Sequence, residues 1–338
     1  MTLFKKAAVF GDIHFGMRNN SQEHNEHCSK YVDWFIAMAK EHGCETCIFV
    51  GDWHHIRSNV NVSTLNYSID NLKKINDAFD HSYFIVGNHD LYYKNSRELN
   101  SLPFTSLFDN ISLYSELTEI DGVTFLPWLV NDEWVNVSKL KSKYLFGHLE
   151  LPKFKMNAMV EMPDHGELQT NHLEQFDYVF TGHFHKRQTK GNVFYIGNPF
   201  PHNFADAWDD ERGMMILEWD GEPEFYNYLD GPKFRTIGLG HLLTDPKRYL
   251  DKNTYAKVTI DTAINFEEMN FLKKVFSDNL GVQEFVMIPE RSDDVEGEFD
   301  GEIEFETIDQ IVVNQLYNVE SKSYKPTLLV EMYKSLDV

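Results

Sequence analysis

The sequence has few cysteines and no long apolar run, and these absences narrow the classes of protein to consider. It holds three cysteines among 338 residues. Cys44 and Cys47 are spaced as C-x-x-C, but no second Cys or His pair lies nearby to complete a tetrahedral zinc site. No apolar segment approaches the roughly 20 residues that span a bilayer, and the N-terminus has no secretory apolar core. We therefore expect a soluble cytoplasmic protein without membrane association and without zinc or redox chemistry at this cysteine pair.

The sequence is also poor in basic residues. It has 31 Lys and Arg against 53 Asp and Glu, which gives a formal net charge of −22 at pH 7. This balance opposes binding to a polyanion through the surface as a whole. A nucleic acid would have to be held locally, by metal ions and by basic side chains near the motifs below, unless those side chains are ordinary solvated residues. These side chains are Arg18, Lys94, Arg97, Lys186, Arg187 and Lys190.

What the sequence does contain is a series of five short His, Asp and Asn motifs within its first 185 residues. They are Asp12-x-His14, Gly51-Asp52, Gly87-Asn88-His89-Asp90, Gly147-His148 and Gly182-His183-Phe184-His185. Most of them follow a short run of β-branched or aromatic residues, which is typical of a strand. Each motif is therefore predicted to be a loop at the carboxyl end of a strand, where open α/β sheets place their sites.

The residue types in these motifs favour a centre with two divalent metal ions. Two ions roughly 4 Å apart need a bridging carboxylate, further oxygen or imidazole ligands, and open positions for water and phosphate. We predict that Asp52 is the bridge and that a shared water is the nucleophile in phosphodiester hydrolysis. The remaining ligands are predicted to be Asp12, His14 and His185 for one metal and Asn88, His148 and His183 for the other.

Three further residues are predicted to take part in catalysis. His89 must point away from the metals if its neighbour Asn88 points toward them, so His89 could protonate the leaving oxygen or orient the phosphate. Asp90 could hold the His89 imidazole in one tautomer. His55 is the expected second phosphate contact, with His54 as the alternative because consecutive loop residues face different ways.

The ordered series of motifs carries more weight than any single one, because an isolated Asp-x-His or Gly-Asp is common by chance. The other histidines lack such a context and are predicted to be surface or satisfied polar residues. They are His24, His27, His42, His81, His165, His172, His202 and His241. Arg212-Gly213 is expected to shape the rim of the site without a catalytic role.

The hydrophobic pattern predicts an α/β fold, a layered α/β/β/α sandwich over residues 1–230 with sheets inside and helices outside. Helices are expected from about Glu23 to Lys40 and over Ser63–Phe79, where Ser63 is the expected N-cap. Hairpin signals surround Asp121-Gly122. These patterns carry the fold prediction and no chemistry.

The rest of the chain is predicted to form three smaller parts. Residues 231–288 should form an α+β capping domain, with a strand over Tyr255–Ile260, a helix from about Phe266 and a strand from Glu284. Residues 289–304 hold eight acidic residues in sixteen positions and are expected to be a linker. Residues 305–338 should form two amphipathic helices that dock on a partner chain or, as the alternative, fold back onto the cap.

The motifs resemble those of the calcineurin-like metallophosphoesterase superfamily. Within it, the segments Gly51-Asp52-Trp53-His54-His55 and Gly197-Asn198-Pro199, with Arg212-Gly213, resemble the SbcD family of double-strand-break repair nucleases. The whole chain is most similar to the short, phage-encoded members. The pair His54-His55 departs from the single histidine that the family generally has there.

The resemblance implies a manganese-dependent DNA nuclease with 3′ to 5′ exonuclease and single-strand endonuclease activity. It also implies two Mn(II) ions, a homodimer, a role in DNA repair and recombination, and an SMC-like ABC ATPase as partner. A phage-encoded protein would act in the host cytoplasm.

Two other functions fit part of the pattern. A small-molecule or cyclic-nucleotide phosphodiesterase would need the same metals but neither the acidic linker nor the terminal helices. A non-catalytic ATPase scaffold would be free to lose metal ligands, and none is missing from the motifs. A protein serine/threonine phosphatase is disfavoured, because its Gly-Asp-x-x-Asp-Arg-Gly loop is replaced here by Gly51-Asp52-Trp53-His54-His55.

Overall fold

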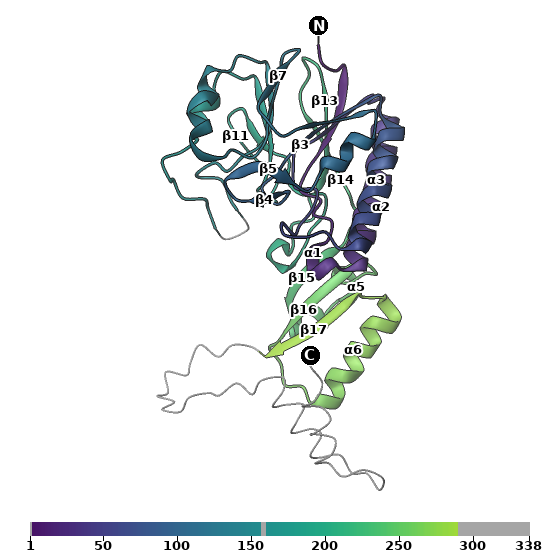
Figure 1. The fold of residues 1–338 in the computed structure, drawn as a ribbon. Coiled ribbons are helices and arrows are strands. Elements are labelled where there is room, and N and C mark those ends of the chain that lie inside the picture. Colours follow the sequence, from purple (N-terminus) through teal and green to yellow (C-terminus); the bar gives the residue numbers. More distant parts are fainter. Residues whose placement is uncertain (1, 157–159, 290–338) are drawn as a thin grey trace, which may run out of the picture. The chain divides into compact units, whose positions relative to one another are not determined.

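The computed structural model describes residues 2–156 and 160–289, and its centre is a pair of six-stranded sheets packed face to face (Figure 1). The first sheet has the order β14 (Glu224–Asn227), β13 (Gly213–Glu218), β1 (Lys6–Phe10), β2 (Thr46–Phe49), β3 (His81–Ile85) and β6 (Ile111–Tyr114). The second has the order β11 (Gln188–Lys190), β12 (Val193–Tyr195), β10 (Tyr178–Gly182), β9 (Tyr144–His148), β8 (Val123–Leu126) and β7 (Thr118–Ile120).

Strands at the centre of both sheets are apolar on both faces because both faces are covered. In β1, Val9 packs between the two sheets, whereas its neighbour Phe10 packs against the outer helices. Phe146 of β9 and Phe180 of β10 complete the layer between the sheets. This burial explains why the strands read as continuous apolar runs in the sequence. It also makes the strand ends rigid supports for the loops that follow them.

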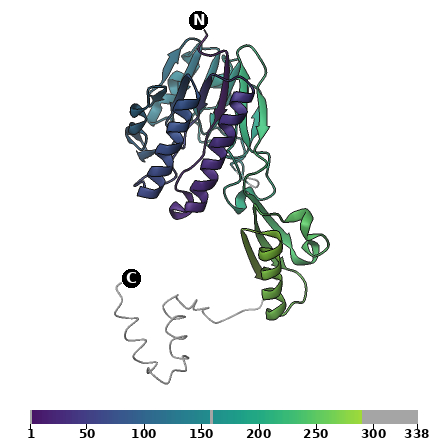
Figure 2. The ribbon, with the colours of Figure 1, turned by 90° about the vertical axis from the view of Figure 1, so that its right-hand side faces the viewer.

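Two long helices cover the outer face of the first sheet. They are α2 (Gln22–Glu41) and α3 (Val62–Ala78), which lie side by side along that face (Figure 2). The Asn61 side chain accepts a hydrogen bond from the backbone N–H of Ser63 and is the N-cap of α3. The expectation that Ser63 would be the cap is therefore wrong by two residues. A short helix, α1 (Met17–Asn20), precedes α2.

The outer face of the second sheet is covered by loops and 3-10 turns, of which the largest are η2 (Asn131–Lys139) and η3 (Thr170–Leu173). The fold is thus the predicted α/β/β/α sandwich, with its fourth layer built from short turns. β7 and β8 form the predicted hairpin, whose Asp121 and Gly122 have φ values of 45° and 83° as a type I′ turn requires. A second hairpin pairs β4 (Leu91–Tyr93) with β5 (Ser96–Asn100).

Residues 233–289 form a separate three-stranded parallel sheet. Its strands are β15 (Lys233–Gly238), β16 (Thr254–Ile260) and β17 (Glu284–Pro289), and its helices are α4 (Leu239–Leu242), α5 (Pro246–Tyr249) and α6 (Phe266–Leu280). The elements predicted here are present, and β15, α4 and α5 are additional. The Arg18 guanidinium joins this sheet to the first part of the chain, because it lies 5.0 Å from the centroid of the Phe234 ring and 4.5 Å from that of Tyr255.

The predicted acidic linker (289–304) and terminal helices (305–338) lie outside the described residues, apart from Pro289, which ends β17. Within residues 2–156 and 160–289, no helix combines the length and apolarity of a membrane span. All three cysteines are buried and free. Burial raises the pKa of the Cys44 thiol to about 11, so this side chain is packed as a neutral thiol.

Candidate dimetal centre

The motif loops converge because their strands are in register. β1 and β2 are parallel with Phe10 opposite Phe49, so the loops that carry Asp12 and Asp52 leave the first sheet side by side. The backbone N–H of Asp12 donates to the carbonyl oxygen of Gly51 at 2.9 Å. In the second sheet, His148 lies opposite Gly182, one residue before His183. Both sheets therefore deliver polar side chains to the same place.

Four of the predicted ligands have left-handed backbone conformations, which non-glycine residues rarely adopt. The φ values are 51° for Asp12, 54° for His14, 63° for Asp52 and 90° for His183. Each such conformation costs on the order of 1–3 kcal/mol and persists where surrounding structure enforces it, typically at functional sites. The sharp turns bring these side chains back toward one another.

Asp12, His14 and His185 form the first half of the cluster. The Nε2 atoms of His14 and His185 lie 3.2 Å apart, and Nε2 of His14 lies 3.6 Å from Oδ2 of Asp52. Asp12 accepts a hydrogen bond at Oδ1 from the backbone N–H of His183, at 2.9 Å. Its Oδ2 atom is buried and has no hydrogen-bond partner among the described residues. An unpartnered buried carboxylate oxygen fits a metal ligand.

The second half of the cluster lies on the other side of Asp52. Nε2 of His148 is 3.4 Å from Oδ2 of Asp52 and 2.9 Å from Oδ1 of Asn88. Oδ1 of Asn88 is in turn 3.0 Å from Nδ1 of His183. The Nδ1–H group of His148 donates a hydrogen bond to the carbonyl oxygen of Val50 at 2.8 Å, which leaves Nε2 to face the cluster. Asp52 thus lies between the two halves of the cluster, and its role as a bridge stays a prediction.

The donor set fits divalent cations. Ligand atoms of Asp12, His14 and His185 all lie within 4.8 Å of one another, and the same holds for Asp12, Asp52 and His148. Burial lowers the pKa of the His185 imidazole to about 4, so its ring is neutral at neutral pH and offers a lone pair. Buried imidazole, carboxylate and amide oxygen together suit manganese, iron and zinc.

Two charged groups of the cluster depend on each other in the absence of a cation. Burial alone would lower the pKa of His148, but Asp52 beside it outweighs burial and raises that pKa to about 9. Burial likewise opposes ionisation of Asp52, yet His148 holds the pKa of this carboxyl below its usual range. The metal-free protein therefore carries a proton on His148 at neutral pH.

Cation binding at His148 is expected to displace that proton. Because the proton is held below about pH 9, the apparent association constant for Mn(II) should fall about tenfold for each pH unit from 9 down to 7. Calorimetric titration in two buffers of different ionisation enthalpy measures the number of protons released. Binding that is independent of pH over this range would contradict the displacement of a proton from His148.

His89 and His55 lie together on one side of the cluster. The Nδ1–H group of His89 donates a hydrogen bond to the carbonyl oxygen of His55 at 2.7 Å, which leaves Nε2 outside this bond. The backbone N–H of His89 donates to Oδ1 of Asp52 at 2.8 Å. The two rings stack with centroids 5.1 Å apart. Ring nitrogens of His14, His55 and His89 also lie within 4.8 Å of one another, so metal binding has to be tested separately from acid catalysis.

The structure separates His55 from His54. His54 is buried, with Nδ1 2.8 Å from the Ser101 hydroxyl and Nε2 3.0 Å from the Ser68 hydroxyl. Both of its nitrogens are engaged away from the cluster. His55 is brought next to His14, with Nδ1 atoms 3.4 Å apart. Of the two alternatives, only His55 remains a possible phosphate contact.

Asp90 has a different position from the one expected. Its carboxylate accepts four backbone N–H groups at 2.9–3.0 Å, from Asp52, Trp53, His54 and Gly87. The prediction that Asp90 holds the His89 imidazole is therefore corrected, because the His55 carbonyl does so. Asp90 instead fixes the backbone of the loop that carries Asp52.

Sequence reasoning missed residues that pack behind the cluster. His202 was predicted to be a surface or satisfied residue, but it is buried, with ring centroids 5.6 Å from His14 and 5.3 Å from His185. Neither ring nitrogen of His202 has a hydrogen-bond partner within the described part of the chain. Nε2 of His24, also buried, lies 3.1 Å from the carbonyl oxygen of His14. A preceding Gly197-Asn198-Pro199 turn was the sole local signal for His202.

Two further residues contact predicted ligands directly. Glu150 lies with Oε2 3.1 Å from Nε2 of His183, which orients Nδ1 of that ring toward Asn88. Arg212 is buried, donates to the carbonyl oxygen of His185 and pairs with Asp206 at 3.1 Å. The expected role of Arg212 in shaping the site is thus a contact with the backbone of a predicted ligand.

Imidazole and carboxylate groups around one central aspartate, at the strand ends of an α/β/β/α sandwich, define a metallophosphoesterase. The sequence profile described as calcineurin-like phosphoesterase matches residues 5–187. The chain belongs to this family. Members of the family use a dimetal centre, and the cluster around Asp52 is the candidate for it. The predicted class of enzyme, a metal-dependent phosphoesterase, is confirmed.

Three similar proteins share 12–26% of their residues with this chain over the matched segments. Exonuclease subunit 1 of Enterobacteria phage T4 is 26% identical over 226 residues, which are 64% of this chain and 66% of the relative. The match thus spans slightly less than two thirds of the relative's length. Among solved structures, Pseudomonas putida nuclease MPE matches with a TM-score of 0.31 and 20% identity over 56% of this chain and 66% of that one. A dimetal phosphatase from Danio rerio matches with a TM-score of 0.37 and 12% identity over 64% and 93%.

Proposed function

We propose that the protein is the nuclease subunit of a DNA repair and recombination complex and that it cleaves DNA phosphodiesters with two divalent metals, Mn(II) in preference. The observation that carries the proposal is the position of His89, whose ring centroid lies 4.9 Å from that of His14 and whose Nδ1 is engaged by the His55 carbonyl, so that Nε2 is the nitrogen left for a substrate. Similarity to a phage exonuclease subunit supports DNA as the substrate. The proposed activities are 3′ to 5′ exonuclease and single-strand endonuclease.

In this proposal, the chain's own residues position the substrate and move one proton. Two bound divalent cations supply charge neutralisation and a water of lowered pKa. Asp12, His14, Asp52, Asn88, His148, His183 and His185 would hold them. His89, oriented by the His55 carbonyl, donates a proton from Nε2 to the departing 3′ oxygen, and His55 contacts a non-bridging phosphate oxygen.

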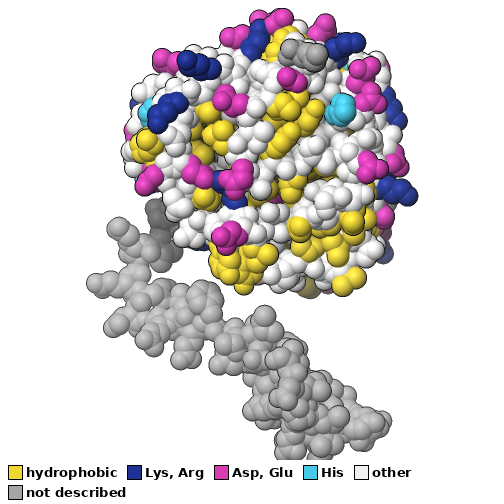
Figure 3. Space-filling model, turned by 45° about the horizontal axis from the view of Figure 1, so that its top comes forward, with side chains coloured by type: hydrophobic (Ala, Val, Ile, Leu, Met, Phe, Trp, Pro, Cys, Tyr) yellow, Lys and Arg dark blue, Asp and Glu magenta, His cyan; other side chains and the backbone are white. Residues whose placement is uncertain are grey.

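The acidic surface makes local positive charge necessary. Acidic side chains are spread over the face shown in Figure 3, interspersed with basic ones. Two cations add four positive charges at the centre, where the scissile phosphate must lie. Binding of DNA is then expected to depend on the metal as well as on salt.

The direct test is degradation of end-labelled single- and double-stranded DNA in the presence of Mn(II), run beside bis-p-nitrophenyl phosphate and a cyclic nucleotide. DNA cleavage that depends on Mn(II) and is lost in His89→Ala supports the nuclease. Hydrolysis of the small diesters with DNA untouched, both alone and with the ATPase partner added, would establish a small-substrate phosphodiesterase instead.

We also propose the domain organisation stated above, with residues 1–230 as nuclease, 231–288 as cap, 289–304 as linker and 305–338 as partner-binding segment. The relative is named as a subunit, which supports a complex. The proposed assembly is a homodimer with an SMC-like ABC ATPase.

Deletion of the residues after Pro289 is expected to abolish association with that ATPase while metal-dependent hydrolysis of a small diester persists. Co-purification of the two chains measures association, and bis-p-nitrophenyl phosphate measures the remaining activity. Association that survives the deletion would place the partner-binding surface in residues 1–289.

A further inference from the structure

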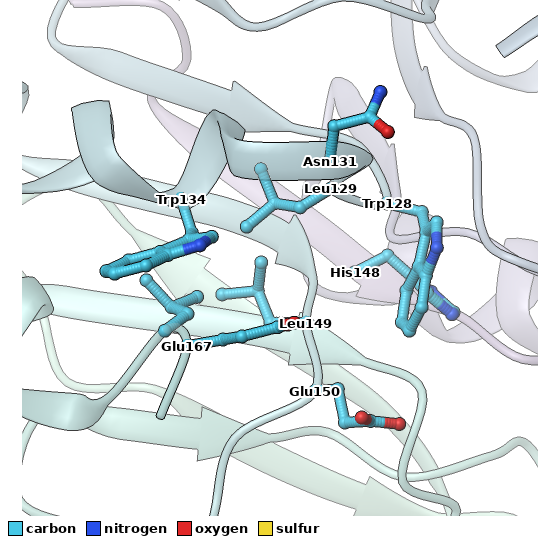
Figure 4. Close-up of a pocket in the computed structure, with 9 residues that line it drawn as sticks. Trp128, Leu129, Asn131, Trp134, His148, Leu149, Glu150 and Glu167 are labelled. Carbon is cyan, nitrogen blue, oxygen red and sulfur yellow. The ribbon is translucent and has the colours of Figure 1, made fainter. Parts of the chain in front are cut away.

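A pocket of about 410 Å³, including its open mouth, adjoins the candidate dimetal centre. In Figure 4 the indoles of Trp128 and Trp134 lie at opposite ends of this pocket, with Leu129 and Leu149 between them. Its lining combines indole and leucine side chains with carboxylate, amide and imidazole groups. The proposed cleavage mechanism does not use this pocket.

The pocket and the centre share a wall. His148, a predicted metal ligand, also lines the pocket beside Trp128 (Figure 4). The centroid of the Trp128 indole lies 6.0 Å from that of the His148 ring and 4.9 Å from that of the His183 ring. A group bound against Trp128 would therefore be separated from a phosphodiester at the metals only by the His148 or His183 side chain.

The chemistry of the walls favours a flat, neutral ring over a phosphate. Glu150 and Glu167 line the pocket, and no Lys or Arg does so among the described residues. Carboxylates repel a phosphate, whereas two indoles offer faces on which a base can stack. Asn131 and the carboxylates at the edges can form hydrogen bonds with the polar edge of a base.

Trp128 is held in place before any ligand binds. Its backbone N–H donates to the carbonyl oxygen of Val86 at 3.0 Å, and its own carbonyl accepts from Arg97 at 2.7 Å. The buried Arg97 guanidinium is fixed by two hydrogen bonds of 2.6 Å to the Glu133 carboxylate. These bonds fix the backbone that carries the indole, and the indole ring itself packs beside His148 and His183. A support that is ordered before binding loses little entropy when a ligand stacks on it.

We propose that this pocket binds the unpaired base of a nucleotide next to the scissile phosphate, stacked on Trp128. The inference rests on the proposed nuclease function and names the part of the substrate that the site recognises. A base cannot enter the pocket while it is paired and stacked in a duplex. Single-stranded or frayed DNA is therefore the form that the centre cleaves most readily.

The test uses single-stranded oligonucleotides in which one linkage is cleavable and the others are protected as phosphorothioates. Two such oligonucleotides each carry one abasic residue, on the 5′ side of that linkage in one and on its 3′ side in the other. The cleavage rate of each is compared with that of the intact oligonucleotide. In the wild-type protein, an abasic residue at one of the two positions is expected to slow cleavage about 5- to 100-fold. In Trp128→Ala this discrimination should approach one, while Trp128→Phe, which keeps an aromatic face, should retain most of it.

Phe266→Ala, which removes an aromatic side chain that is 71% exposed on α6, is the matched control and should discriminate as the wild type does. Equal discrimination in wild type and Trp128→Ala, or none in the wild type, would contradict base binding in this pocket without contradicting the proposed nuclease activity. Hydrolysis of bis-p-nitrophenyl phosphate without any cleavage of DNA, both alone and with the ATPase partner added, would overturn the proposed function, and the pocket with it.

Discussion

Replacing His89 with alanine is expected to lower the rate of DNA cleavage about 10²- to 10⁴-fold while two metal ions remain bound. His89 is predicted to donate a proton to the leaving oxygen. In His89→Ala, no other side chain among the described residues occupies its position to donate that proton. Its Nδ1 proton is held by the His55 carbonyl at 2.7 Å, so the ring presents Nε2 in a fixed direction. Turnover with end-labelled DNA gives the rate, and plasma mass spectrometry gives the metal content.

Two further variants make this result decisive. Asp52→Ala should lose metal as well as activity, because Oδ2 of Asp52 lies between His14 and His148, at 3.6 Å and 3.4 Å from their Nε2 atoms. His81→Ala removes an exposed histidine at the start of β3 and should match the wild type in both measurements. Metal loss in His89→Ala equal to that in Asp52→Ala would make His89 a ligand, as its distance from His14 and His55 would allow.

Replacing Asp90 with alanine is expected to destabilise the fold by roughly 3–6 kcal/mol, since four buried backbone N–H groups would lose their acceptor at about 1–3 kcal/mol each before relaxation. The four donors are those of Asp52, Trp53, His54 and Gly87. Urea unfolding of the metal-free protein measures the loss without the contribution of bound cations.

The Asp90 prediction separates a structural role from the tautomer role inferred from the motif. Asp90→Asn keeps an acceptor for two of the four N–H groups, so we expect an intermediate loss of stability. If Asp90 served His89 alone, both substitutions would lower activity without lowering the free energy of unfolding. That outcome would contradict the hydrogen bonds described here.

The sequence predicted the central part of the fold because local patterns determine it. β1, β2, β3, β9 and β10 are each a short apolar run followed by glycine or a polar turn, and α2 and α3 have apolar stripes of helical period. The fourth layer could not be predicted as turns, since a 3-10 turn is too short to show a period. β15 was missed because Lys233–Gly238 alternates weakly and includes Arg235.

The motifs named the residues of the centre but not their hydrogen bonds. His89 and Asp90 were singled out together, yet apart from Gly87 their partners described above lie 34–38 residues away in the chain, so a motif of four residues could not assign them. His202 and Trp128 belong to the same neighbourhood through packing alone. Local sequence thus identified groups with ligand chemistry, whereas tertiary contacts decide which support them.

The separation of His14 from His185 along the chain has a consequence for folding. Their Nε2 atoms lie 3.2 Å apart although 171 positions separate the two residues in the sequence. Closing so long a loop is slow and entropically unfavourable until the strands of both sheets have paired. We expect cations to bind only after this pairing and to stabilise the native state in proportion to the logarithm of their concentration. Metal uptake during refolding should therefore coincide with the last kinetic phase, and a chelator should speed unfolding without slowing the early collapse of the chain.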